Sequence, residues 1–209
     1  MTQRVMNTAL AATIGIGLAV AGVATIAEAS QHDKPVRAAI RDAKGARLGT
    51  LTVKSRDHGR SLVTVHVRNL APGYHGFHVH TVGKCEPKAI DPATKLASPF
   101  FTAGAHLDLA PGGHNHADHS GDLPPLLVGK DGKGTASFST DRFRVAQLTD
   151  ADGSAIIVHG LRDNLAYIPE RYAPNGPDEV TLKTGDAGPR IGCGVIQKIN
   201  AAKGAKGPK

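Results

Sequence analysis

The sequence contains no tryptophan, and aromatic residues make up only 4% of its 209 residues. A hydrophobic core must therefore be built mainly from valine, isoleucine, leucine and alanine. Basic residues are nowhere interleaved with aromatic ones, although the formal net charge is +7. Surfaces that bind single-stranded nucleic acid use aromatic rings on which the bases stack, so this composition argues against a nucleic-acid partner.

After the N-terminal region the sequence lacks any apolar run of the roughly 20 residues that cross a bilayer. One such run lies between Thr8 and Ile26, follows Arg4, and is itself followed by the small-x-small sequence Ala27-Glu28-Ala29. This pattern predicts a signal peptide over residues 1–29, with an uncleaved membrane anchor as the alternative. The mature protein is expected to be periplasmic, extracellular or held at the cell surface, and not to span a membrane.

Cysteine is scarce, and Cys85 and Cys193 are the only two. A lone pair in an exported protein is expected to form a disulfide, because compartments outside the cytoplasm are oxidising. Two buried thiols are the alternative. A disulfide would close a loop of about 108 residues, and this would stabilise the fold by at most about 4–5 kcal/mol in the chain-entropy model.

Glycine and proline are plentiful, with 25 and 13 residues, and they favour many turns between short strands. No convincing amphipathic helix is present. Apolar, β-branched segments predict about eight strands, over residues 36–40, 47–53, 61–68, 74–80, 126–128, 135–139, 154–159 and 191–196. The predicted fold class is all-β: an eight-stranded Greek-key β-sandwich or barrel with two long functional loops.

The chain is expected to fold as one domain over residues 30–198. Its two long loops run from 81 to 125 and from 160 to 190, and loops of this length in a compact domain are usually functional or disordered. Residues 199–209 are rich in lysine, glycine and alanine, and they predict a basic, disordered tail. Adhesion of this tail to an anionic cell surface is one hypothesis for its role.

Histidines are concentrated in one region, since seven of the 11 lie between His75 and His119. His78 and His80 are two residues apart in a predicted strand, so their rings point to the same face and suit one metal ion. Alone, such a pair is more often an ordinary surface pair than a metal site. Four histidines and a carboxylate follow within about 17 residues: His106, His114, His116, His119 and Asp122. Such a set fits a zinc site, and a solvated histidine-rich loop is the alternative.

Several segments resemble the copper–zinc superoxide dismutase family, in its exported bacterial form. They are the copper motif GYHGFHVH at 73–80, the bridging-histidine segment AGAH at 103–106, the zinc motif HSGDLP at 119–124, the strand IIVH at 156–159 and the signature GDAGPRIGCGVI at 185–196. The signature has Asp186 where the family usually has asparagine. The resemblance covers roughly residues 35–198.

The resemblance implies an enzyme that converts superoxide to oxygen and hydrogen peroxide at a copper centre cycling between Cu(II) and Cu(I). Copper would be held by His78, His80, His106 and His159. Zinc would be held by the bridging His106 together with His114, His119 and Asp122. His116 lies two residues from His114 and is the alternative zinc ligand.

Three further residues receive roles from the resemblance. Asp163 corresponds to an aspartate that links a copper histidine to a zinc histidine. Arg190 corresponds to the catalytic arginine that receives the anion beside copper, and Lys183 to a lysine that helps to steer it. His75 precedes the copper pair by three residues, so we expect it to face away from the metal and to be structural.

Two other functions remain open at this point. The chain could be a copper-only dismutase, or a non-catalytic copper- and zinc-binding protein of the same fold. Residues 167–177 are an apparent insertion whose role the sequence does not define. The sequence does not decide between a monomer and a homodimer.

Overall fold

The computed structural model describes residues 33–111 and 113–199. The predicted signal peptide and residues 200–209 of the predicted tail lie outside the described residues. Within the described part of the chain, no helix is long and apolar enough to cross a membrane.

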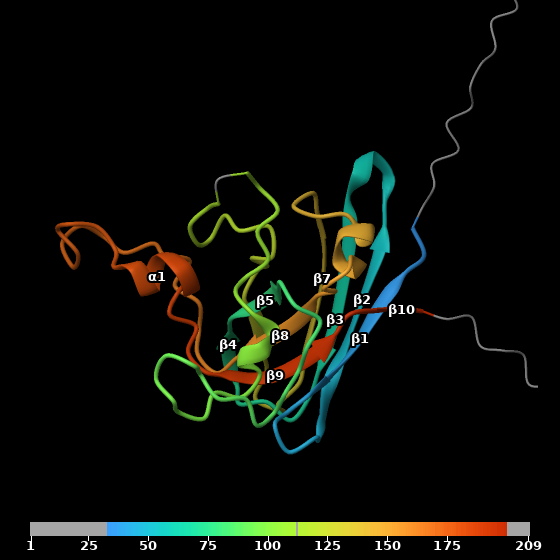
Figure 1. Ribbon diagram of the computed structural model, residues 1–209, viewed down its shortest axis with the longest axis horizontal. Helices are drawn as coiled ribbons and strands as arrows, with labels where there is room; N and C mark the ends of the chain where they lie inside the picture. The colour runs from blue at the N-terminus through green and yellow to red at the C-terminus, as the bar shows by residue number, and fades with distance from the viewer. Residues whose placement is uncertain (1–32, 112, 200–209) are drawn as a thin grey trace, which may run out of the picture. The chain divides into compact units, whose positions relative to one another are not determined.

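The described residues form mostly strands, as predicted (Figure 1). Besides the one α-helix, α1 (Glu179–Thr184), there are short 3-10 turns at Asp57–Gly59, Phe101–Ala103 and Val145–Thr149. The strands are β1 (Val36–Arg41), β2 (Arg47–Ser55), β3 (Ser61–Val67), β4 (Gly73–His75), β5 (Phe77–His80), β6 (Leu126–Val128), β7 (Gly134–Thr140), β8 (Ala155–His159), β9 (Arg190–Val195) and β10 (Gln197–Lys198).

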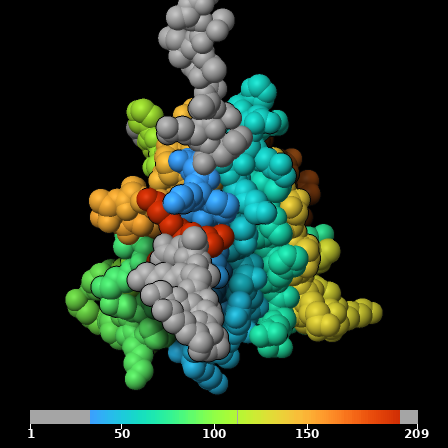
Figure 2. Space-filling model, turned by 90° about the vertical axis from the view of Figure 1, so that its right-hand side faces the viewer, coloured from blue at the N-terminus to red at the C-terminus, as the bar shows by residue number. Residues whose placement is uncertain are grey.

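The strands are antiparallel and run in the order β5-β8-β9-β1-β2-β3-β7, with β10 added beside β1. Figure 2 shows the face on which the blue β1, the cyan β2 and the red C-terminal β10 lie side by side. β6 leads into β7 through a turn closed by the hydrogen bond from Gly129 N–H to Lys133 O, and β6 pairs with β4. β4 and β6 form a separate two-stranded sheet, which the chain joins to β5 of the larger, curled sheet through Gly76.

Alternation of apolar and polar residues places the core inside this curled sheet. In β1, Val36, Ala38 and Ile40 are buried while the residues between them are exposed. β3 repeats the pattern with Val63 and Val65, which are both fully buried. Since successive side chains of a strand point to opposite faces, this period of two brings β-branched residues to the inner face of each strand.

The predicted strand over 74–80 is in fact two strands that separate at Gly76. A Cβ at this position would lie only 2.5 Å from Ala187 Cβ and 3.3 Å from His159 Cβ. The absence of a side chain thus allows the C-terminal loop to approach. The interruption also transfers the chain from pairing with β6 to pairing with β8.

Helix α1 was not predicted, because six residues are too few to show an apolar period. Its ends carry ordinary capping signals. The Asp178 carboxylate accepts a hydrogen bond of 2.8 Å from Thr181 N–H, and Gly185 ends the helix in the left-handed conformation, at φ 59°. In Figure 1, α1 lies on the side of β5, β8 and β9 rather than beside β2 and β3.

The predicted disulfide between Cys85 and Cys193 is confirmed, with the two Cα atoms 5.7 Å apart. It joins the first long loop to β9. Phe100 and Ile157 form with Cys193 a small apolar cluster beneath this loop. The disulfide therefore attaches the loop that carries His106 to the sheet.

Replacing both cysteines, as Cys85→Ala/Cys193→Ala, should lower the free energy of unfolding by up to about 4–5 kcal/mol, because the unfolded chain loses its 108-residue crosslink. Urea denaturation of the metal-free protein measures this. Reduced wild-type protein is the control and should lose a similar amount. A loss below about 1 kcal/mol would contradict a stabilising role.

Candidate metal centre

Four histidine rings converge at one end of β5 and β8. His78 and His80 lie on β5 and are completely buried, while His159 ends the neighbouring strand β8. His106 comes from the first long loop, which meets β5 through an isolated bridge to His80. One donor atom from each of the four histidines lies within 4.8 Å of the other three. The structure thus brings together the four residues predicted to hold copper.

Oxygen acceptors around the strand histidines determine which ring nitrogen is protonated. His80 Nδ1 donates to Gly104 O at 2.9 Å, and His159 Nδ1 donates to Gly188 O at 3.0 Å. His78 instead uses Nε2, which donates to Asp163 Oδ2 at 2.6 Å. A neutral imidazole carries one proton, so the other nitrogen of each ring presents a lone pair.

Among the described residues, these lone-pair nitrogens have no hydrogen-bond partner. They are buried, and they comprise His78 Nδ1, His80 Nε2 and His159 Nε2. A buried polar atom without a partner is costly, and a metal ion satisfies several at once. The first cluster therefore fits a copper ion in its donor chemistry, since imidazole suits copper.

A second cluster surrounds the buried carboxylate of Asp122. Its Oδ1 accepts from His106 Nδ1 at 2.7 Å, and its Oδ2 accepts from His119 Nδ1 at 2.9 Å. His116 Nδ1 lies 3.0 Å from the same Oδ2, but without the alignment of a hydrogen bond. Three imidazoles and a carboxylate are a donor set typical of zinc. His106 faces both clusters, one through each ring nitrogen.

Asp163 connects the two clusters from behind. Besides His78 Nε2, its carboxylate accepts from His116 Nε2 at 2.8 and 2.9 Å. Its side chain has no exposed surface. Gly185 makes this packing feasible, because a Cβ there would lie 2.2 Å from Asp163 Oδ1 and 2.5 Å from His116 Nε2. Asp163 therefore orients one ring of each cluster.

Burial and charge set the protonation of the rings. Burial, reinforced by neighbouring positive charge, lowers the pKa of His159 to about 3. Burial likewise lowers the pKa of His106 to about 4, against the opposing effect of Asp122. For His116 burial also lowers the pKa, but the close carboxylates of Asp122 and Asp163 outweigh it and raise the pKa to about 9. The first cluster thus offers neutral imidazoles, whereas the second attracts a cation.

Both carboxylates of the centre stay ionised. Burial alone would raise the pKa of Asp122 and of Asp163. Hydrogen bonds from the neighbouring imidazoles outweigh burial and hold the pKa of each carboxyl well below its usual range. The negative charge of Asp122 therefore lies within the second cluster and that of Asp163 directly behind it, between the two clusters, and this favours a divalent ion in the second cluster.

Comparison with known proteins agrees with this geometry. The sequence model of the family described as "Copper/zinc superoxide dismutase (SODC)" matches residues 47–196. The chain belongs to the copper/zinc superoxide dismutase family. That family uses copper and zinc.

Relatives and solved structures of this superoxide dismutase family are similar over much of the chain. "Superoxide dismutase [Cu-Zn]" of Mycolicibacterium paratuberculosis is 48% identical over 61% of this chain, but the match spans only 57% of that protein. The protein of the same name from Deinococcus radiodurans is 33% identical over 90% of this chain and 94% of its own length. The Cu/Zn superoxide dismutase from Brucella abortus has a TM-score of 0.61 at 26% identity, covering 78% of this chain and 100% of that one.

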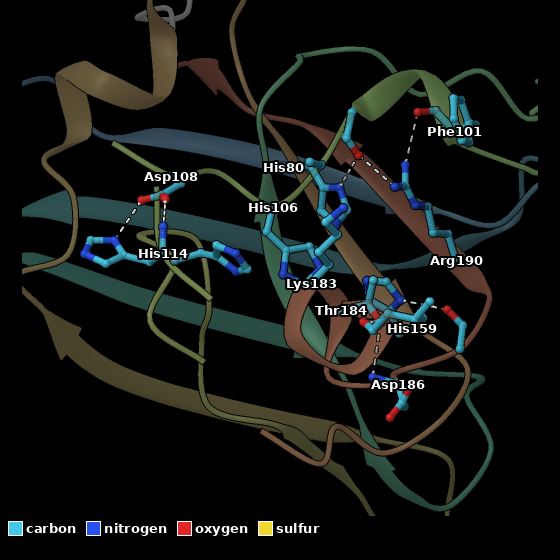
Figure 3. Close-up of a pocket in the computed structure, with 15 residues that line it drawn as sticks. His80, Phe101, His106, Asp108, His114, His159, Lys183, Thr184, Asp186 and Arg190 are labelled. Carbon is cyan, nitrogen blue, oxygen red and sulfur yellow. Dashed lines mark hydrogen bonds and ion pairs between the residues drawn. The ribbon is translucent and has the colours of Figure 1, made fainter. Parts of the chain in front are cut away.

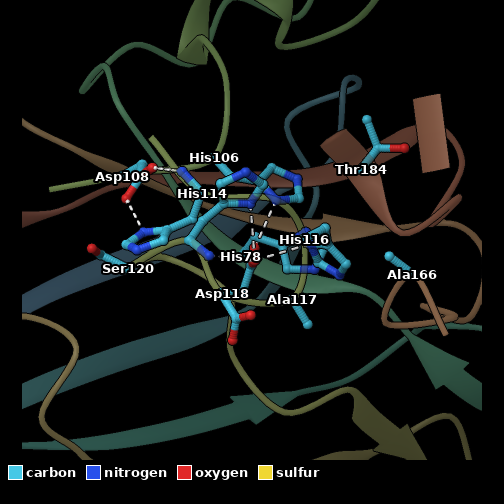
Figure 4. A network of polar contacts seen from close by, with 12 residues as sticks. His78, His106, Asp108, His114, His116, Ala117, Asp118, Ser120, Ala166 and Thr184 are labelled. Carbon is cyan, nitrogen blue, oxygen red and sulfur yellow. Dashed lines mark hydrogen bonds and ion pairs between the residues drawn. The ribbon is translucent and has the colours of Figure 1, made fainter. Parts of the chain in front are cut away.

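Within this dismutase fold, the two candidate zinc histidines lie in different places (Figure 4). His116 is buried and lies beside His78, Asp122 and Asp163. The His114 side chain is 46% exposed, and its Nδ1 lies 3.2 Å from Asp108. The structure thus differs from the prediction made from spacing. In a loop without regular structure the distance along the chain does not fix which ring points inward.

A cavity of about 850 Å³ opens onto the candidate metal centre. Figure 3 shows Arg190 beside His80 and His159, with Asp108 and His114 toward the opposite end. The Arg190 guanidinium donates to the carbonyls of Phe100, Phe101 and Gly104 at 2.7–3.2 Å. A guanidinium has five N–H donors, so donors remain for an anion.

Lys183 also lines this cavity, as the resemblance implied, but it forms an ion pair with Glu179 one helical turn earlier. Sequence analysis did not identify this partner, although the i, i+4 spacing was a usable signal. His75 is buried and belongs to neither group of candidate metal ligands, and its ring nitrogens contact His159 O at 2.7 Å and Ala71 O at 2.8 Å.

We predict that His116→Ala abolishes stoichiometric zinc binding, because it removes a buried imidazole that faces Asp122. His114→Ala is the matched control and should keep zinc, since its ring faces Asp108. Metal analysis of both variants after loading with copper and zinc is the measurement. Loss of zinc from the His114 variant but not from the His116 variant would refute this reading of the centre.

Proposed function

We propose that this chain is a copper–zinc superoxide dismutase, which converts two superoxide anions and two protons to oxygen and hydrogen peroxide. The observation that carries this proposal is the convergence of four buried imidazoles below a cavity edged by Arg190. Copper would lie among His78, His80, His106 and His159. Zinc would lie among His106, His116, His119 and Asp122.

Copper bound here would supply a one-electron redox centre that alternates between Cu(II) and Cu(I). The chain's own residues prepare the site for it. Gly104 O fixes the ring of His80 and also accepts from Arg190 Nη2 at 2.7 Å. One carbonyl group thus sets the distance between a copper ligand and the residue that receives the anion.

His106 is the residue suited to hold a proton during turnover. Its Nδ1 is hydrogen-bonded to Asp122, and since the ring also belongs to the cluster of four histidines, Nε2 is the nitrogen left for that cluster. Nε2 would therefore be the nitrogen that takes up a proton while Asp122 keeps the ring in place, and because burial lowers the pKa of His106 to about 4, the ring would give that proton back readily. This exchange limits the change of charge at the centre as an electron arrives and leaves.

Arg190 acts by capturing the substrate. Superoxide is a small anion, and a positive terminus at the base of a cavity raises its local concentration. A guanidinium is always charged and presents parallel donors, which suits an anion better than an ammonium. Three carbonyl contacts hold Arg190 in this position, so little conformational entropy is lost when the anion binds.

Export also belongs to the proposal. The disulfide Cys85–Cys193 is typical of proteins in oxidising compartments. Relatives named "Superoxide dismutase [Cu-Zn]" come from bacteria, in which such compartments lie outside the cytoplasm. We propose a periplasmic, extracellular or cell-surface location. A homodimer is compatible with the chain, and sedimentation of the purified protein would measure it.

Superoxide turnover by the copper- and zinc-loaded protein tests the proposed activity. Stopped-flow decay of superoxide should be accelerated by the loaded protein, lost after chelation and recovered on adding copper back. A loaded protein that leaves superoxide untouched would favour the non-catalytic metal-binding alternative. Full activity with copper and no bound zinc would favour the copper-only alternative.

We expect Arg190→Ala to lower kcat/KM at low ionic strength by about 10-fold or more, because electrostatic capture contributes factors of this size. Copper content should not change, since Arg190 is not a ligand. Arg190→Lys keeps the charge but loses the parallel donors, so its kcat/KM should lie between those of the wild-type protein and of Arg190→Ala. Unchanged turnover of the alanine variant would remove Arg190 from the mechanism.

A further inference from the structure

The two halves of the metal centre are supported in different ways. His78, His80 and His159 belong to strands β5 and β8, which pair along their length. His116 and His119 belong to a segment of the first long loop that has no strand or helix. The rings of the zinc half therefore depend on how the backbone between these two histidines is held.

Arg142 contacts this backbone directly. Its Nη1 donates to Ala117 O at 2.6 Å and to His119 O at 3.0 Å. Its Nη2 lies 3.5 Å from Asp118 Oδ1. One planar guanidinium thus contacts three consecutive residues, which begin directly after His116 and end at His119. The rigid fork of arginine suits such contacts better than the single point charge of lysine.

The part of the chain that carries Arg142 is firmly anchored. It directly follows β7, which pairs with β3 from Gly134 to Thr140. The next residue, Phe143, is buried, and its carbonyl accepts a buried hydrogen bond of 2.9 Å from Ser61 Oγ. Arg142 therefore extends from a fixed part of the sheet.

Between the loop and this part of the sheet lies a cavity of about 530 Å³, lined by Ala117 and Asp122 on one side and by Thr140 and Arg142 on the other. The guanidinium makes its hydrogen bonds to the loop side. The loop is thus held to the sheet here by polar contacts as well as by packing. Loss of these contacts would leave Ala117 O and His119 O free to move.

We infer that Arg142 is a positioning residue for the zinc half of the centre. It holds the backbone of residues 117–119 so that the rings of His116 and His119 both face Asp122. Its effect should fall mainly on zinc, because strand pairing holds the copper histidines of β5 and β8, and only His78 is linked to this loop segment, through Asp163. The inference rests on the proposed function, which places zinc in this cluster.

The experiment compares Arg142→Ala with wild-type protein, both loaded with copper and zinc. Zinc release to a coloured chelator should be about 10- to 100-fold faster in the variant, the range found when residues that orient metal ligands are lost. Copper should be retained as in wild type. Cobalt(II) replacing zinc should show an altered visible spectrum, which reports the geometry of the ligands rather than the stability of the fold.

Two further variants separate the contacts. Asp118→Asn removes the ion pair but keeps both carbonyl hydrogen bonds, and it should release zinc within about 2-fold of the wild-type rate, since exposed ion pairs contribute little. Arg142→Lys keeps the charge but reaches one carbonyl at best, and it should be intermediate. Thermal unfolding of the metal-free proteins identifies any general loss of stability.

Equal zinc release from wild type and Arg142→Ala would overturn the inference while leaving the proposed function intact. Loss of copper and zinc together, with a lower unfolding temperature of the metal-free variant, would also overturn it, because the role would then be general. A wild-type protein that takes up no zinc would contradict the zinc half of the proposed function and this inference with it.

Discussion

The metal centre depends on one interaction, the sharing of the buried Asp163 carboxylate between His78 and His116. A carboxylate without exposed surface is stable only when its hydrogen bonds are satisfied. Each imidazole must therefore turn its Nε2 toward Asp163, and its Nδ1 then points away, into the centre. The same contact sets the tautomer of one ring in each cluster, so the two halves are aligned before an ion binds.

The rest of the fold brings two kinds of segment to the metal centre, rigid strands and irregular loops. Strands supply the rings whose direction follows from the period of two, while the loops supply His106, His116 and His119. Irregular backbone needs separate supports, and the structure provides several. The disulfide attaches the first loop to β9, Gly104 O joins His80 to Arg190, and Arg142 binds the backbone before His119. Precision at the centre is thus obtained from local contacts that differ from ligand to ligand.

The sequence predicts those parts of the structure that a periodic pattern governs. The strand positions, the common face of His78 and His80, and the disulfide follow from alternation, from spacing and from a single pair of cysteines. The interruption at Gly76 does not, since it depends on the approach of Ala187 from a distant loop. Nor does the choice between His114 and His116, because two rings two residues apart in a loop can point either way. Arg142 gives no signal, since its partners are backbone carbonyls, which every residue has.

Electrostatic capture in this chain cannot be attributed to the formal charge of +7. Close to the centre, Lys183 is paired with Glu179, and Asp186 adds a carboxylate to the cavity lining. Asp186 accepts hydrogen bonds from Asn164 and Thr181 and so joins the second loop to α1. Its negative charge lies in the cavity lining, where it repels an anion. At about 0.1 M salt, the field of an exposed charge is largely screened beyond about 10 Å. The attraction that reaches an anion at the metal must therefore come chiefly from Arg190 and from the ions themselves.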